Sequence, residues 1–194
     1  MVSKYKVLLY IVCACATMLL TSVASASNDT ARHWADGGGG PGYVNVVDNT
    51  AVWPVKPAVD EWDHAGRLQA NYRTACQGAG HCVGLSAVSY LGGFTCHELQ
   101  GVTVTAANSN NHLLTQTFIE INNHCRSDPH NHPNSELRVI TCHEIGHALS
   151  LAHVAADQHS TCMANGTMLS PPQSNTPRQH DFVMLDDNMY DHTD

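Results

Sequence analysis

Positive charge is scarce in this sequence. Its 194 residues include 9 lysines and arginines against 17 aspartates and glutamates, which gives a formal net charge of −8 at pH 7. A chain of this charge is repelled by nucleic acid and by anionic lipid, so we expect neither nucleic acid nor a membrane as its partner. Long apolar runs are also missing after the first 26 residues, so we expect no membrane-spanning segment there.

The one long apolar run, near the N-terminus, is typical of a signal peptide. Lys4 and Lys6 make its start positive, the run ends at about Leu20, and residues 24–26 (Ala-Ser-Ala) form a small-x-small cleavage site. We therefore predict that residues 1–26 are removed and that the protein is secreted. Because the leader takes both lysines with it, the remaining chain has 7 basic and 17 acidic residues, a formal net charge of −10.

The predicted mature chain contains six cysteines but no Cys-x-x-Cys pair, so disulfides are favoured over a thiolate zinc cluster. An even number in an exported chain indicates up to three disulfides, and six cysteines allow fifteen pairings. We expect nearest neighbours to pair, which gives Cys76–Cys82, Cys96–Cys125 and Cys142–Cys162. Cys15, in the leader, could instead carry a lipid, but the residues before it fit an acylation box poorly.

Composition divides the mature chain into an arm and one domain. Residues 27–41 are polar and Gly-rich and are predicted to form a flexible N-terminal arm, followed by one domain over residues 42–194. Apolar periodicity predicts the helices and strands of this domain. The expected strands are Tyr43–Val47, Leu68–Thr74, Val83–Tyr90, Gly101–Ala106 and Thr115–Asn122, and the expected helices are Val55–Leu68, Glu136–Ser150 (capped by Asn134 or Ser135) and residues 177–190.

A His-Glu-x-x-His pattern lies in the second predicted helix. His143 and His147 are four residues apart, so their side chains share one helix face and can bind one zinc ion. Glu144 lies beside the metal without binding it, and it can take a proton from a zinc-bound water. The pattern is short and also occurs by chance, so a further ligand is needed to make it specific.

His153, six residues after His147, is the candidate for the third ligand. A continuous helix would carry it about 9 Å further along the axis, so the chain has to leave the helix and turn back. Three histidines with one open position are typical of a catalytic zinc. A downstream glutamate ligand is excluded because no glutamate follows Glu144, and Asp157 or Asp181 is a less favoured third ligand.

The stretch HEIGHALSLAH at 143–153 resembles the zinc motif of the metzincins, His-Glu-x-x-His-x-x-Gly-x-x-His, at four of its five marked positions. The difference is Ser150, which stands where the family has the glycine that breaks the helix. Glycine suits the positive φ of such a position, and serine in its place is expected to cost about 1 kcal/mol. Whether a turn with serine at this position still directs the His153 side chain to the zinc stays open.

The resemblance, closest to the small secreted matrixin-like branch, implies an α+β domain with two lobes. The upper lobe would hold a twisted, mostly parallel five-stranded sheet and two helices, and the lower lobe a methionine turn and the C-terminal helix. Met163 is similar to the methionine beneath the zinc of this family, with Met168 or plain core packing as alternatives. The segment Gln100–Ala107 would be the edge strand along which an extended protein or peptide substrate binds, or simply an ordinary edge strand.

The function that the resemblance implies is that of a secreted, monomeric zinc endopeptidase. It would use one catalytic zinc ion and hydrolyse peptide bonds through a zinc-bound water assisted by Glu144. The alternative is a non-enzymatic zinc-binding or adhesion module on the same scaffold, which Ser150 favours and the presence of Glu144 opposes. Residues 27–60 contain no cysteine-switch segment, and no loop pattern for a second, structural zinc is found. Calcium is possible but not indicated, and Asp29 or Asp36 could cap the zinc.

The remaining histidines have plainer interpretations. His124, His130 and His132 could bind a second metal, but a solvated polar loop is the favoured interpretation. His180 and Asp181 are expected to be surface or packing residues of the last helix.

Overall fold

The computed structural model describes residues 33–35, 42–63, 66, 68–76, 81–89, 91–107, 113–127, 133–155, 161–165 and 174–189. The predicted leader and most of the predicted arm lie outside the described residues, so the domain boundaries at 26 and 41 stay predictions.

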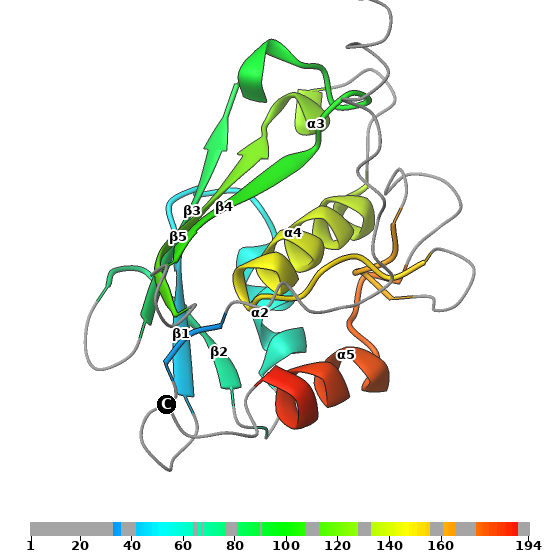
Figure 1. The fold of residues 1–194 in the computed structure, drawn as a ribbon. Helices are drawn as coiled ribbons and strands as arrows, with labels where there is room; N and C mark the ends of the chain where they lie inside the picture. The colour runs from blue at the N-terminus through cyan, green and yellow to red at the C-terminus, as the bar shows by residue number, and fades with distance from the viewer. Residues whose placement is uncertain are drawn as a thin grey trace, which may run out of the picture.

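A five-stranded sheet forms the centre of the fold (Figure 1). Its strands are β1 (Gly42–Asp48), β2 (Leu68–Arg73), β3 (His81–Val88), β4 (Gly101–Ala107) and β5 (Leu114–Asn122), in the spatial order β2-β1-β3-β5-β4. Neighbours pair in parallel except β4, which pairs antiparallel with β5. The predicted α+β class and mostly parallel sheet are confirmed, and β4 is an edge strand as predicted.

Two helices, α2 (Val55–Trp62) and α4 (Asn134–Ala148), pack on each other and against one face of the sheet (Figure 1). The apolar face of α2 is buried, and its last residue, Trp62, donates its indole N–H to the carbonyl of Cys142 at 3.0 Å. α4, the helix that carries the histidine motif, therefore contributes buried side chains to the core between the helices and the sheet. The short helices α3 (His124–Ser127) and η1 (Leu91–Gly93) lie in connections between these elements.

The helix predicted over Val55–Leu68 is too long. α2 ends at Trp62, and Leu68 is instead the buried first residue of β2. Between them, Gly66 approaches Asp186 so closely that an added Cβ would overlap the carboxylate. Packing of Leu68 in the sheet thus places it in a strand, and the predicted helix ends six residues earlier.

The histidine helix also differs from the prediction at both ends. Asn134 and Ser135 are its first two residues, and Pro133 occupies the N-cap position without a side-chain hydrogen bond, so the predicted cap is wrong. The helix ends at Ala148 because Ser150, predicted to be its last residue, has a φ of 84°.

The C-terminal segment forms α5 (Gln179–Val183) and the π-helical turn η2 (Met184–Met189). The predicted single helix is therefore shorter and changes its winding, and Pro177 precedes it instead of lying in its first turn. Phe182 packs edge-on against Trp62, with ring centroids 5.8 Å apart, and Leu185 is buried. The contact between Phe182 and Trp62 docks the segment against the end of α2.

The arm predicted to be flexible includes three described residues, His33–Ala35, and they belong to the folded domain. Trp34 is only 2% exposed, stacks on His81, and donates its indole N–H to the carbonyl of Ala148 at 2.8 Å. His33 pairs with Leu113 just before β5. Trp34 therefore fixes the end of the histidine helix from a distant part of the sequence.

The three predicted disulfides, Cys76–Cys82, Cys96–Cys125 and Cys142–Cys162, are all formed. They indicate a protein that folds in an oxidising, extracellular-type compartment. Among the described residues, no helix has both the length and the apolar character needed to cross a membrane.

Candidate metal centre

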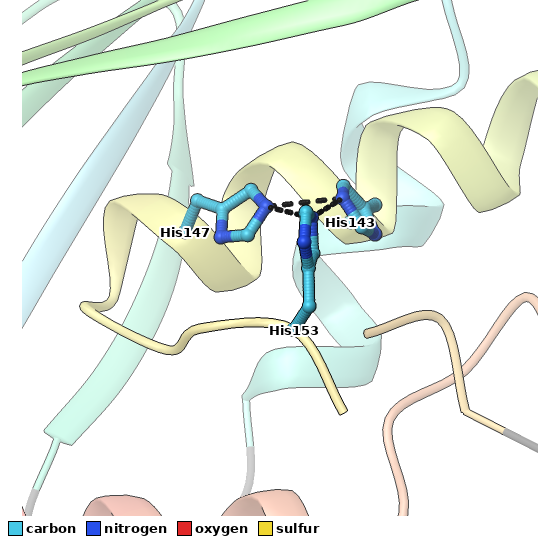
Figure 2. Close-up of side chains that lie close together, drawn as sticks. All are labelled: His143, His147 and His153. Atoms are coloured by element: carbon cyan, nitrogen blue, oxygen red, sulfur yellow. Dashed lines mark hydrogen bonds between the residues drawn. The ribbon is translucent and has the colours of Figure 1, made fainter. Parts of the chain in front are cut away.

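Helix α4 and the chain beyond it bring three histidines together (Figure 2). The Nε2 atoms of His143 and His147 are 3.0 Å apart, and Nε2 of His153 lies 3.0 Å from the first and 3.1 Å from the second. One ion at the usual zinc–nitrogen distance of about 2.0–2.1 Å could touch all three nitrogens. The structure thus brings the three predicted ligands to a single point.

A tight turn at the end of α4 returns the chain to the metal centre. The amide of Leu151 donates to the carbonyl of Gly146, and the amide of Ser150 donates to that of His147, both at 3.0 Å. This is the Schellman arrangement, which requires a left-handed residue at the position of Ser150. Ser150 adopts it with a φ of 84°, so the serine keeps the turn that delivers His153.

Backbone carbonyls fix which ring nitrogen carries the hydrogen in two of these histidines. Nδ1 of His143 donates to the carbonyl of Cys162, and Nδ1 of His147 donates to the carbonyl of Leu151, both at 2.7 Å. A carbonyl can only accept, so in each neutral ring Nδ1 carries the hydrogen and Nε2 presents a lone pair. Two lone pairs facing each other at 3.0 Å repel, and a shared cation removes that repulsion. The site can hold one metal ion.

Burial favours the neutral form of these histidines, which is the form that binds metal. Burial and the neighbouring His147 and His153 hold the pKa of His143 well below its usual value. Burial lowers the pKa of His147 to about 4, with a smaller contribution from His153, and it lowers the pKa of His153 as well.

Glu144 lies beside the ligand set and faces the edge strand. The hydroxyl of Thr103 on β4 lies 2.7 Å from its Oε2 and 2.9 Å from its backbone carbonyl. At Gly101 an added Cβ would lie 2.8 Å from Oε1, so the absence of a side chain there makes room for the carboxylate. Glu144 is 3% exposed, and burial raises its pKa to about 7 against the opposing effect of the Thr103 hydrogen bond.

Met163 lies in a tight turn packed against α4. The amide of Ala164 donates to the carbonyl of Thr161, and the fully buried Met163 is so close to Gly146 that an added Cβ there would overlap its sulfur. The preceding residue, Cys162, is joined to α4 by its disulfide to Cys142. Met163 therefore packs directly against Gly146 of α4, while Met168 lies outside the described residues, so the choice of Met163 as the family's methionine stays a prediction.

An open cavity of about 400 Å³ lies over the metal centre. Residues 97–103, which lead into and begin β4, form one wall, and the side chains of His143, Glu144, His147 and His153 form the other. The histidines are thus reachable from solvent along the edge of the sheet. We refer to this cavity as the cleft.

The other predicted candidates are placed elsewhere. Asp181 is fully buried and accepts a hydrogen bond from the hydroxyl of Thr161 at 2.5 Å, so it holds the methionine turn and is not the third ligand. Nδ1 of His124 accepts from the amide of Cys96 at 3.2 Å. His180 is exposed on α5. Residues 29, 36, 130, 132 and 157, which were also candidates, lie outside the described residues.

Sequence reasoning missed Thr103 and the structural role of Asp181. Thr103 is separated from Glu144 by 41 residues, and its hydroxyl reaches the carboxylate only because β4 packs beside α4. No local spacing pattern in the sequence predicts such a contact.

No protein-family model matches this chain, and no curated protein matches it in sequence. The functional argument therefore depends on the residues of the site and their geometry.

Proposed function

We propose that this protein is a secreted zinc-dependent endopeptidase of the metzincin type. The observation that carries the proposal is the convergence of three histidine Nε2 atoms in an open cleft, beside a buried carboxylate that contacts none of them. A site for storage or structure would need no free carboxylate next to its ligands. An endopeptidase needs both parts and access for a polypeptide.

Zinc is the ion that this donor set suits best. Three imidazoles around one point leave a fourth position open, which is typical of catalytic zinc. When bound, zinc would supply Lewis-acid chemistry, polarising the scissile carbonyl and acidifying water. His143, His147 and His153 would hold it, and the carbonyls of Cys162 and Leu151 would keep the first two rings in orientation.

Glu144 performs the proton transfers in this proposal. Its carboxylate takes a proton from the attacking water and passes it to the departing amine, so the peptide C–N bond breaks and an amine and a carboxylic acid form. Thr103 keeps one oxygen of the carboxylate in place with its hydroxyl and leaves the other, Oε1, directed toward the cleft wall at Gly101.

The edge strand β4 supports an extended substrate. On its inner side β4 pairs with β5, and among the described strands none pairs with its outer edge. A peptide laid along that edge gains main-chain hydrogen bonds that do not depend on its sequence. Such binding would place a scissile bond beside Glu144, because Thr103 belongs to the same strand.

The alternative of a non-enzymatic zinc-binding module has lost its main support. That alternative depends on Ser150 disturbing the turn, but Ser150 takes the left-handed conformation that the turn requires. The lower part of the molecule, with Met163 and the docked α5, is likewise compatible with the two-lobed fold that we propose.

Hydrolysis of denatured casein by the purified mature chain tests this function. We expect cleavage that a zinc chelator abolishes and that zinc restores. The matched variant Glu144→Ala should retain one zinc per chain and lose turnover by at least about a hundredfold. Full activity in Glu144→Ala, or cleavage that is indifferent to the chelator, would rule the proposal out.

A further inference from the structure

Ser150 combines two unfavourable features at one residue. It holds a left-handed backbone conformation, with a φ of 84°, that favours glycine. Its hydroxyl is also buried without a hydrogen-bond partner, and the residue is only 2% exposed. Buried unsatisfied hydroxyls are uncommon in native proteins, and each one calls for a physical explanation. Glycine would have avoided both costs, so the hydroxyl needs an explanation.

Ser150 lines a second cavity, of about 230 Å³, next to the cleft. Leu114 and Leu151 supply apolar wall, and Thr105 adds another hydroxyl. The cavity shares two lining residues, Thr103 and His147, with the cleft. It therefore begins at the metal centre and extends toward the far end of β4.

The geometry of β4 connects this cavity to a bound peptide. Gly101, Thr103 and Thr105 are two residues apart, so they share the face of the strand that is directed at α4. In a peptide paired with β4, alternate side chains are also directed toward α4, about 6.6–6.8 Å apart. One such side chain would enter the cleft beside Glu144, and another would enter the cavity at Ser150.

The lining of the cavity selects the chemistry of that side chain. The hydroxyl of Thr103 is already donated to Glu144. The hydroxyl of Ser150 has no partner and can donate to a ligand, and the hydroxyl of Thr105 provides a second polar group in the lining. None of the described residues that line the cavity is acidic, so a lysine or arginine would find no counter-charge there. The leucines suit an apolar stem.

We propose that this cavity is a substrate subsite for an uncharged carboxamide side chain, glutamine or asparagine, whose oxygen accepts from the Ser150 hydroxyl. The inference rests on the proposed endopeptidase function, because it assumes that a peptide lies along β4. It names a specificity residue, Ser150, that contacts the substrate away from the bond that is cut.

Paired peptides test the subsite. Each pair is alanine-based and fluorescent, and its two members carry Gln or Met, which have similar size, at the same position, with successive pairs moving that position along the peptide. Binding is measured by fluorescence anisotropy on the zinc-loaded Glu144→Ala chain, and cleavage is measured on the wild-type chain. At one position we expect Gln to bind roughly three- to tenfold more tightly than Met.

The control variant separates the hydroxyl from the backbone. Glu144→Ala combined with Ser150→Ala keeps a Cβ at the left-handed position but removes the hydroxyl, and the preference for Gln should disappear. Equal binding of Gln and Met at every position would overturn the subsite, even if the wild-type chain cuts the peptides. Selective binding without cleavage would overturn the endopeptidase function and leave the subsite standing, whereas no binding of any peptide would overturn both.

Discussion

Glu144 and His153 lie in one cleft, but different kinds of structure hold them. Glu144 belongs to the regular helix α4 and is fixed by β4, a strand that pairs antiparallel with β5. His153 belongs to a segment without a regular helix or strand, held by the turn at Ser150, by two backbone bonds that join Val154 to residues 163 and 165, and by one disulfide. The sheet thus positions the proposed base, while a few specific contacts complete the metal site.

We therefore expect substitutions in the irregular segment that carries His153 to weaken metal binding. The largest effect is expected for His153→Ala, which removes the ligand that this segment supplies. Zinc affinity should fall by at least about a hundredfold, because two imidazoles remain. Competition with a chromophoric chelator measures it, and His180→Ala on the exposed part of α5 is the control. Unchanged affinity in His153→Ala would mean that another group is the third ligand.

The disulfides test the same comparison at the level of stability. The Cys142–Cys162 bond closes a sequence separation of 20 residues and joins α4 to the methionine turn, whereas Cys76–Cys82 closes only 6. Replacing both cysteines of the first bond by alanine should cost about 3 kcal/mol in urea unfolding and weaken zinc about tenfold, since the carbonyl of Cys162 orients His143. The same replacement at Cys76–Cys82 should cost about 2 kcal/mol and leave zinc affinity unchanged.

Equal loss of zinc in the two double variants would show that the Cys142–Cys162 bond has no special role at the metal centre.

Substitutions in β4 that affect Glu144 should instead lower turnover and leave zinc binding unchanged. Thr103→Val removes the hydroxyl that reaches Glu144 but keeps the shape of the side chain. The kcat for peptide hydrolysis should fall about tenfold, with KM and zinc content unchanged, because the carboxylate loses one oriented hydrogen bond. Thr103→Ser restores the hydroxyl and should restore most of the kcat. A loss of zinc in Thr103→Val would show that β4 also contributes to metal binding and does not only position Glu144.

The smallest effect is expected at Ser150, where α4 gives way to the irregular segment that carries His153. Ser150→Gly removes the strain of a positive φ and the buried unpaired hydroxyl, and it should stabilise the protein by about 1 kcal/mol, or roughly 2–4 °C in Tm. Calorimetry measures the change. Ser150→Ala removes the same hydroxyl but keeps the left-handed Cβ, so it should bring only part of this gain. If alanine stabilised the chain as much as glycine, the backbone would not be the source of the strain.

Much of the candidate site could be predicted because its signals are local. The spacing of His143, Glu144 and His147 needs only a helix, and His153 follows from the length of a turn. Pairing of nearest cysteines was sufficient for all three disulfides. The boundaries of the strands were predicted to within two residues, because β-branched and apolar residues are concentrated in these segments.

The errors occurred where distant residues decide the outcome. Leu68 was included in the predicted helix Val55–Leu68, yet it is the first residue of β2. Trp34 looks like part of a flexible arm, yet it is buried against the end of α4 by a hydrogen bond across 114 residues. Asn134 and Ser135 look like helix caps, but the helix begins one residue earlier than a cap would allow.

The sequence by itself determined which residues could bind a metal and which carboxylate stands beside them, since helical periodicity and a turn of fixed length suffice for that. Only the tertiary structure decided how these groups are held. Thr103 against Glu144, the carbonyl of Cys162 against His143, and the unpaired hydroxyl of Ser150 in its cavity all arise from the packing of α4 between β4 and the methionine turn. Such contacts join residues whose distance in space is fixed by the whole fold, so no local pattern can encode them.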